Sequence, residues 1–161
     1  MNNDIIYGPL PPEREAEAVA LVRSVFDTAV APGYGEQGRA TFHDYVTQLA
    51  FSQRSQGAFA LTAEQGGKVI GVIEVLDTGH VALLFVSPDR QGLGVGGELM
   101  RRAVAHCRRS SGAPTQFTVN ASPNAVPAYE RMGFAATNTE QELNGVRFVP
   151  MTMPLSPPAT S

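Results

Sequence analysis

A glycine-rich segment is the part of this chain whose residue types best suit binding chemistry. Residues 86–97 read Val-Ser-Pro-Asp-Arg-Gln-Gly-Leu-Gly-Val-Gly-Gly, between an apolar run and an amphipathic one. This order predicts a strand, a turn and then a helix. Glycines let a ligand approach the backbone N–H groups closely, and a helix N-terminus attracts negative charge. The segment therefore predicts an anion site, most simply for a cofactor diphosphate; a structural turn without a ligand is the plain alternative.

The same glycines also fit the dinucleotide-binding turn, because Gly92, Gly94 and Gly97 have the spacing G-x-G-x-x-G. Three features disfavour that reading. The apolar run ends at Val86, several residues before the glycines, and no acidic residue stands near position 112 to bind a ribose. The preceding segment also reads as an antiparallel meander rather than a βαβ unit. A dinucleotide site is therefore the less favoured alternative.

The elements around the turn predict an α+β domain. Two helices are expected near the N-terminus, one beginning at Glu13 and one with an apolar face over residues 42–50. The runs 58–63, 69–76 and 81–86 are short and apolar, and glycine turns separate them, which is typical of an antiparallel meander. The last of these runs is apolar on both faces, so we expect it to be central and covered on both sides.

The second half of the chain continues with alternating elements. After the glycines we expect a helix with Leu99, Met100, Ala103, Val104 and Cys107 on its buried face. A strand over 116–120 follows, and then a helix that opens at Ser122 and ends before Gly133. Asn144-Gly145 predicts a hairpin between strands 136–143 and 146–153.

Length and composition limit the classes of protein. The 161 residues suit one domain, expected over 1–153, with a disordered tail at 154–161. A net charge of −3 argues against nucleic acid as a partner, and no apolar run is long enough to span a membrane. The start lacks the pattern of a signal peptide, so we expect a cytoplasmic protein. The single Cys107 excludes an intrachain disulfide and a multi-cysteine metal site, and no metal is expected.

Two motifs resemble the GCN5-related N-acetyltransferase (GNAT) superfamily. Gln-Gly-Leu-Gly-Val-Gly at 91–96 has the form Gln/Arg-x-x-Gly-x-Gly/Ala, and the run 119–134 ends in Tyr-Glu-Arg-Met-Gly-Phe, like a strand–helix segment of the family. The matches cover residues 80–153, whereas residues 1–57 agree only as two helices. The resemblance implies a mixed, mostly antiparallel central sheet with helices on both faces, a three-layer α/β/α arrangement.

The resemblance also implies a cofactor, acetyl-CoA, in a V-shaped opening between the strands at 80–86 and 116–120. Its diphosphate would lie on the glycine turn, its pantetheine arm would pair with the backbone of Phe85 and Val86, and the Val86 N–H would face the thioester oxygen. Many family members have Asn seven residues before the tyrosine, where this chain has Ser122, so Asn120 could make that contact instead. The expected cofactor contacts are Phe85, Val86, Arg90, Gln91, Gly92, Leu93, Gly94, Val95, Gly96, Gly97, Asn120, Ser122 and Tyr129.

Three residues are candidates for acid–base catalysis. Tyr129 has the position of the family's general acid, which would protonate the departing CoA thiolate; packing in the core is its alternative role. An alkyl ammonium has a pKa of ~10.4, so its deprotonation at neutral pH costs roughly 4–5 kcal/mol and a base is useful. His80 and Glu74 are the candidates for that base, with His80 favoured, although either could simply be a polar residue at a strand edge.

The resemblance implies an N-acetyltransferase that acetylates an amine by direct attack, through a tetrahedral intermediate. The loop around Tyr34 and Glu36 and the last hairpin would roof the acceptor cleft. Glu36, Glu74 or Tyr45 could attract a cationic amine, which would be a small molecule or a peptide. A non-catalytic acyl-CoA-binding sensor or interaction module of the same fold is the alternative, and a homodimer is possible because family members often pair.

Overall fold

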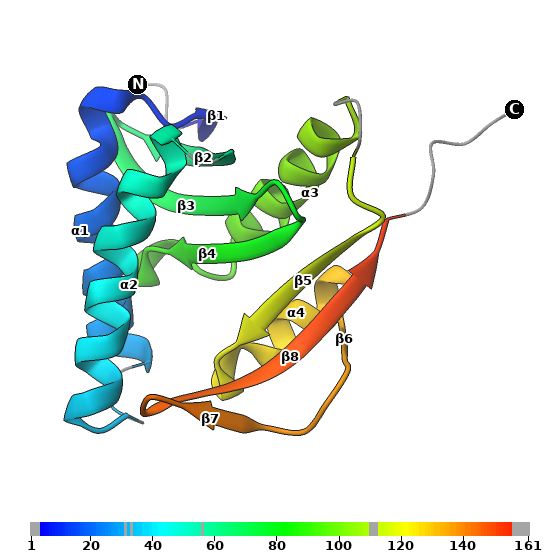
Figure 1. The fold of residues 1–161 in the computed structure, drawn as a ribbon. Helices are drawn as coiled ribbons and strands as arrows, with labels where there is room; N and C mark the ends of the chain where they lie inside the picture. Colours follow the sequence, from blue (N-terminus) through cyan, green and yellow to red (C-terminus); the bar gives the residue numbers. More distant parts are fainter. Residues whose placement is uncertain (1–3, 31, 33, 56, 110–112, 156–161) are drawn as a thin grey trace, which may run out of the picture.

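A single mixed sheet runs through the molecule between two layers of helices (Figure 1). The computed structural model describes residues 4–30, 32, 34–55, 57–109 and 113–155. Its eight strands include a path in the order β1-β2-β3-β4-β5-β8-β6, and β7 pairs with β8 beside that path. Every pairing is antiparallel except that of β4 with β5. The predicted three-layer arrangement is therefore confirmed.

The N-terminal helices and the meander follow the predicted periodicity. The elements are β1 (Ile6–Pro9), η1 (Pro12–Arg14), α1 (Glu15–Val25), the π-helical turn η2 (Phe26–Val30), α2 (Glu36–Ser55), β2 (Ala58–Gln65), β3 (Lys68–Leu76) and β4 (His80–Val86). No local pattern predicts β1, because Gly8 and Pro9 are poor strand formers. Its place at the edge of the sheet explains why Pro9 is tolerated there.

The segment after the meander holds the glycine turn and two further helices. The elements are η4 (Pro88–Arg90), α3 (Val95–Arg108), β5 (Gln116–Ala121), η5 (Pro123–Ala125) and α4 (Val126–Met132). Ser122 opens η5 rather than the α-helix, and its side chain makes no capping bond. Pro127 lies in the first turn of α4, where a proline removes no needed hydrogen bond. Gly133 ends the helix at a φ of 110°, as predicted.

The C-terminal hairpin differs from the prediction in the length of its first strand. Asn144 and Gly145 both have positive φ, at 53° and 82°, which fits the predicted two-residue turn. The strand predicted over 136–143 is instead two short pieces, β6 (Ala135–Ala136) and β7 (Gln141–Leu143), because the chain bends where Thr139 N–H donates to Asn138 Oδ1. β8 (Val146–Pro154) pairs with both pieces and with β5.

The end of β8 also changes the predicted boundary of the tail. Pro154 pairs with Gln116, and the Leu155 N–H donates to Thr115 O at 2.9 Å. The expected disorder from residue 154 is therefore wrong at its first two positions. Residues 156–161, the rest of that prediction, lie outside the described residues.

Apolar clusters fill both faces of the sheet. One lies against α3 and α4 and includes Leu99, Phe117 and Tyr129. The other lies against α1 and α2 and includes Val22 and Val46. β4 contributes to both, so the expectation of a central strand covered on both sides is confirmed. Within the part of the chain that the structure describes, no helix is long and apolar enough to cross a membrane.

Candidate functional site

The central feature of the site is the point where β4 and β5 separate. The two strands pair in parallel only at His80–Thr118 and Val81–Val119. At the same place the register of β4 against β3 shifts, since Val81 pairs with Val75 and Leu83 pairs with Glu74. Ala82 is thus the extra residue of a β-bulge, and bulges bend and twist a strand. The bulge explains why β4 leaves β5 here, so we call this point the vertex of the opening.

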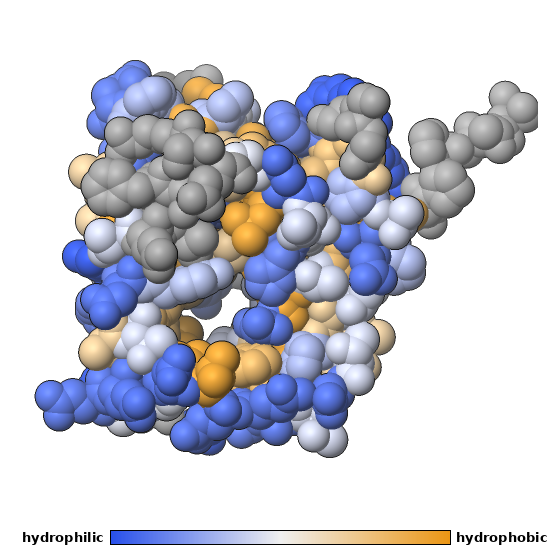
Figure 2. Space-filling view, viewed as in Figure 1, coloured by the Kyte–Doolittle hydropathy of each residue, from blue (hydrophilic) through white to orange (hydrophobic). Residues whose placement is uncertain are grey.

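Beyond the vertex the two strands diverge into an open cleft. Figure 1 shows β5 running away from β4, and Figure 2 shows the molecule hollowed there, below β4 and between α2 and the lower ends of β5 and β8. The expected V-shaped opening between these strands is therefore present.

The backbone of β4 presents alternate residues to this cleft. Ser87 N–H donates to Ile70 O at 2.8 Å, so Ser87 is hydrogen-bonded to β3. Antiparallel pairs alternate, which directs the N–H and C=O groups of Leu84 and Val86 to the open side and those of Phe85 to β3. The backbone groups of Phe85, which were expected to pair with a cofactor, are therefore directed to β3, whereas those of Leu84 face the opening. The Val86 N–H faces the opening as expected.

The glycine turn lies at the outer end of β4. Gly92 and Gly94 have φ of 85° and 79°, a conformation that costs glycine little and other residues strain. Gly94 precedes α3, and the first intrahelical bond is Glu98 N–H to Gly94 O, which leaves the N–H groups of the first turn without helical partners. A Cβ at Gly92, Gly94 or Gly97 would meet nothing within 4 Å. The turn therefore has the open space and the donors that a diphosphate needs.

Side chains near the turn anchor it to the sheet. Gln91 Nε2 donates to Val86 O at 3.1 Å, which ties the turn to the end of β4. Arg90 Nε donates to Gln65 Oε1 at 2.5 Å, and its Nη1 lies 2.9 Å from Asp89 Oδ2. The Arg90 guanidinium thus already binds two protein groups, and the apolar side chain of Leu93, which is 64% exposed, cannot bind a phosphate. Among the expected phosphate contacts, the backbone N–H groups are therefore the ones available to bind a phosphate.

Glu74 lies beside the vertex on the face covered by α1 and α2. It pairs with Leu83, the first residue beyond the bulge, and only 3% of it is exposed. Its Oε1 is buried and, among the described residues, has no hydrogen-bond partner. Burial, and secondly the charge of Glu15, raises the pKa of Glu74 to about 7. Glu74 lines the same small cavity as Val72, whereas Ile70 packs in the cluster on the opposite face.

Tyr129 lies on the opposite face of the sheet, in the cluster with α3. Its ring meets Phe134 edge-on with centroids 5.4 Å apart, and 7% of the residue is exposed. Burial raises the pKa of its hydroxyl well above the usual range, so the group keeps its proton at neutral pH. A protonated phenol can donate a proton or a hydrogen bond, which a general acid must do.

His80 lies behind the vertex, where β4 and β5 are still paired. Its Nδ1 is 2.8 Å from Thr118 Oγ1, within hydrogen-bond distance. Burial lowers the pKa of His80, so the imidazole is neutral at pH 7. The His80 side chain therefore contacts β5 in the paired part of the two strands and does not border the opening.

The residues expected to bind the acceptor or pantetheine have different surroundings. Tyr34 is buried and donates its hydroxyl to Arg147 O at 2.6 Å, while Thr41 Oγ1 donates to Asn144 O at 2.9 Å. The N-terminal loop and the hairpin are therefore joined across the cleft. Glu36 and Asn120 are exposed, and Ser122 donates to Asn124 Oδ1 at 2.8 Å. Burial first, and then the charge of Glu74, raises the pKa of Tyr45.

Sequence reasoning missed three residues of this site. Ala82 and Leu84 depend on the bulge, for which the apolar run 81–86 carries no signal. Glu15 shares a small cavity with Glu74. A signal for Glu15 was present, because it stands three and seven residues before Ala18 and Val22 and so belongs to the apolar face of α1.

Comparisons with known proteins agree with this geometry. The model of the acetyltransferase (GNAT) domain family matches residues 30–155. A curated mycothiol acetyltransferase from Propionibacterium freudenreichii is 28% identical over 113 residues, which is 65% of this chain and 36% of that protein. The chain thus spans little more than a third of the length of that relative.

Solved structures share the fold over nearly the whole chain. A GCN5-related N-acetyltransferase from Rhodopseudomonas palustris, also named aminotransferase, class-II, is 25% identical with a TM-score of 0.76, and the match covers 96% of this chain and 99% of that one. The PaiA N-acetyltransferase of Thermoplasma acidophilum, solved in complex with coenzyme A, is 16% identical with a TM-score of 0.69, covering 94% and 99%. The second likeness concerns the fold alone.

Proposed function

The chain belongs to the acetyltransferase (GNAT) family, and from this premise we propose that it transfers the acetyl group of acetyl-CoA to the amine of an acceptor. The observation that carries the proposal is the vertex at Ala82. A protonated phenol, Tyr129, lies in the apolar cluster on one face of the sheet, and a carboxyl group with a pKa of about 7, Glu74, lies beside the vertex on the other face. An acid and a base on opposite faces suit a reaction in the opening between the strands.

The residues present fit the donor. Open space at Gly92, Gly94 and Gly97 and the free N–H groups at the start of α3 support a diphosphate at the turn. The outward N–H groups of Leu84 and Val86 support pairing with the pantetheine arm along β4. The Leu84 N–H is nearer the vertex, so we propose that it, rather than Val86, stabilises negative charge on the thioester oxygen. Bound acetyl-CoA would supply the activated acetyl group.

Glu74 is the better candidate for the base. A general base works best when its pKa lies near the working pH, and a pKa of about 7 meets this condition. An approaching ammonium would lose a proton to Glu74 and attack as the free amine, while Tyr129 would donate a proton to the departing thiolate. His80, which the sequence favours as the base, lies in the paired part of the strands and would instead form a hydrogen bond with Thr118.

The acceptor side is formed by α1, α2 and the hairpin. Because Tyr34 and Thr41 bind the hairpin, an acceptor must fit within a bridged opening rather than across an open groove. This arrangement favours small amines over folded proteins. The alternative is a non-catalytic module that binds acyl-CoA, and the retained acid and base argue against it.

Thiol release from acetyl-CoA in the presence of a panel of small amines and peptides tests the proposal. We expect turnover with at least one small amine and its loss in Glu74→Gln. The matched control is Glu13→Gln, which makes the same change at an exposed position in η1. Tight CoA binding without turnover across the panel would favour the non-catalytic alternative, and no CoA binding would refute both.

A further inference from the structure

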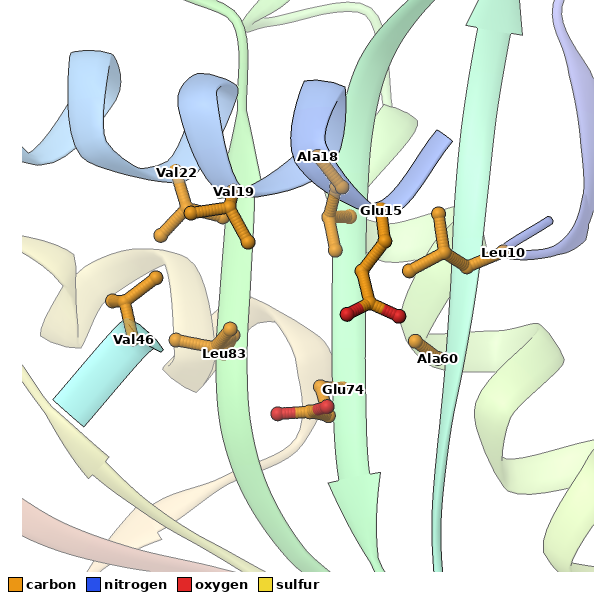
Figure 3. Close-up of a pocket in the computed structure, with 10 residues that line it drawn as sticks. Leu10, Glu15, Ala18, Val19, Val22, Val46, Ala60, Glu74 and Leu83 are labelled. Atoms are coloured by element: carbon orange, nitrogen blue, oxygen red, sulfur yellow. The ribbon is translucent and has the colours of Figure 1, made fainter. Parts of the chain in front are cut away.

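A small cavity lies behind Glu74, on the side of α1. Its volume is about 20 Å³, which gives room for a water molecule. The lining comes from Leu10, which follows β1, and from residues of β2, β3, β4, α1 and α2; it is apolar except for two carboxylates, those of Glu74 and Glu15. Figure 3 shows the Glu15 side chain reaching from α1 toward the sheet, on the side of Glu74.

Glu74 brings an unpartnered group to this cavity. The residue is 3% exposed, and its Oε1 has no hydrogen-bond partner in the part of the chain that the structure describes. A buried polar atom without a partner is unfavourable, so its retention calls for an explanation. Glu15, by contrast, is only half-buried at the start of α1, so its carboxylate links the cavity to solvent.

We propose that the cavity and Glu15 form the route by which the proton taken up by Glu74 returns to solvent, with Glu15 as a positioning residue. The proposal rests on the proposed function. The N–H bond of the acceptor ammonium breaks and an O–H bond forms on Glu74. That O–H bond then breaks in turn, and its proton passes to a water in the cavity, which releases a proton past Glu15. The Glu74 carboxylate is restored for the next acceptor, and no other reactant is needed.

The other side chains around Glu74 that the structure describes do not offer such a route. Val72, Leu83 and Val46, from β3, β4 and α2, are apolar and buried. Tyr45 on α2 is the other titratable group that interacts with Glu74, and its raised pKa keeps it protonated at neutral pH. It therefore cannot take up the proton. Glu15 is the group on α1 that can accept a hydrogen bond from a water in the cavity.

The test compares Glu15→Gln with Glu13→Gln, the same change at an exposed position just before α1. We expect kcat of Glu15→Gln to fall by up to about a hundredfold, the lower end of the range for acid–base groups, with little change in KM for the amine. The acid limb of the pH profile of kcat/KM should also move to lower pH in this variant, because the negative charge of Glu15, which raises the pKa of Glu74, has been removed. Glu13→Gln should resemble the unmodified protein.

A titration of the ¹³C-labelled glutamate carboxyls by NMR separates the two proposals. A lower Glu74 midpoint in Glu15→Gln together with reduced kcat supports the route. An unchanged midpoint or an unchanged kcat, while the unmodified protein turns over, overturns the route and leaves the proposed function standing. Absence of turnover in the unmodified protein overturns the proposed function itself.

A second variant tests the cavity rather than the charge. Ala60 pairs with Glu74 and lines the cavity, so Ala60→Val fills the space with methyl groups and leaves Glu15 in place. We expect kcat to fall in this variant with a larger solvent isotope effect, while circular dichroism shows a folded protein. A folded Ala60→Val with unchanged kcat overturns the route.

Discussion

Replacement of Glu74 by glutamine should stabilise the protein at alkaline pH while it abolishes turnover. The carboxyl is buried and its pKa is raised from 4.5 to about 7. In the unfolded chain the group ionises near 4.5, but in the folded protein it stays protonated until about pH 7. Unfolding therefore releases a proton over this range, and the unmodified protein loses stability as the pH rises through it.

The size of the effect follows from the pKa difference. At about 1.4 kcal/mol for each pKa unit, the rise from 4.5 to about 7 corresponds to about 3 kcal/mol. Glutamine has nearly the same shape and cannot ionise, so it avoids this loss. We expect Glu74→Gln to match the unmodified protein in free energy of unfolding near pH 4.5 to 5, and to exceed it by about 3 kcal/mol above pH 8.

Chemical denaturation at half-unit steps from pH 5 to 9 measures this difference, with Glu13→Gln as the control that should show none. The kcat/KM of the unmodified protein should rise as the pH passes about 7, because Glu74 then becomes the free base. A stability difference that does not change with pH would show that Glu74 is not held protonated in the folded protein. Full activity in Glu74→Gln would show that the group is no base.

Three further substitutions test the remaining parts of the site. Tyr129→Phe should lower kcat by about 10²-fold or more and leave the Kd for CoA unchanged, since it removes the acid and not a phosphate contact; unchanged kcat contradicts that role. Gly94→Glu should abolish CoA binding in calorimetry, because the side chain strains a φ of 79° and places a negative charge at the turn; normal binding would move the phosphate site elsewhere. His80→Asn should reduce activity far less than Glu74→Gln, and an equal loss would restore His80 as the base.

The parts of the fold that sequence predicted are those with local signals. The glycine turn, the Asn144-Gly145 hairpin turn and the cap at Gly133 each depend on residues that tolerate positive φ, and all three have it. The helices at α1 and α3 follow the apolar spacing of their own residues. These signals depend only on neighbouring residues in the sequence and not on tertiary contacts, so the corresponding elements can be predicted from the sequence.

The errors arise where a distant partner decides the outcome. β1 has little strand propensity, and its pairing with β2 alone makes it a strand. Pro154 looked like the start of a tail, but Gln116 supplies the partner that continues β8. Glu74 and His80 could not be separated by residue type, because burial and the register of β4 distinguish them. Tertiary pairing overrides local preference at each of these positions.

The bulge at Ala82 accounts for more of the site than any other single feature. The extra residue puts Ala82 and Leu83 consecutively on the face of α1 and α2, so every residue beyond it is turned over relative to a regular strand. That reversal directs the backbone of Leu84 and Val86 to the cleft. The same bend ends the pairing with β5 and opens the cleft next to Glu74. One inserted residue thus fixes together where the opening begins, which N–H groups face it and which residue of β4 pairs with Glu74.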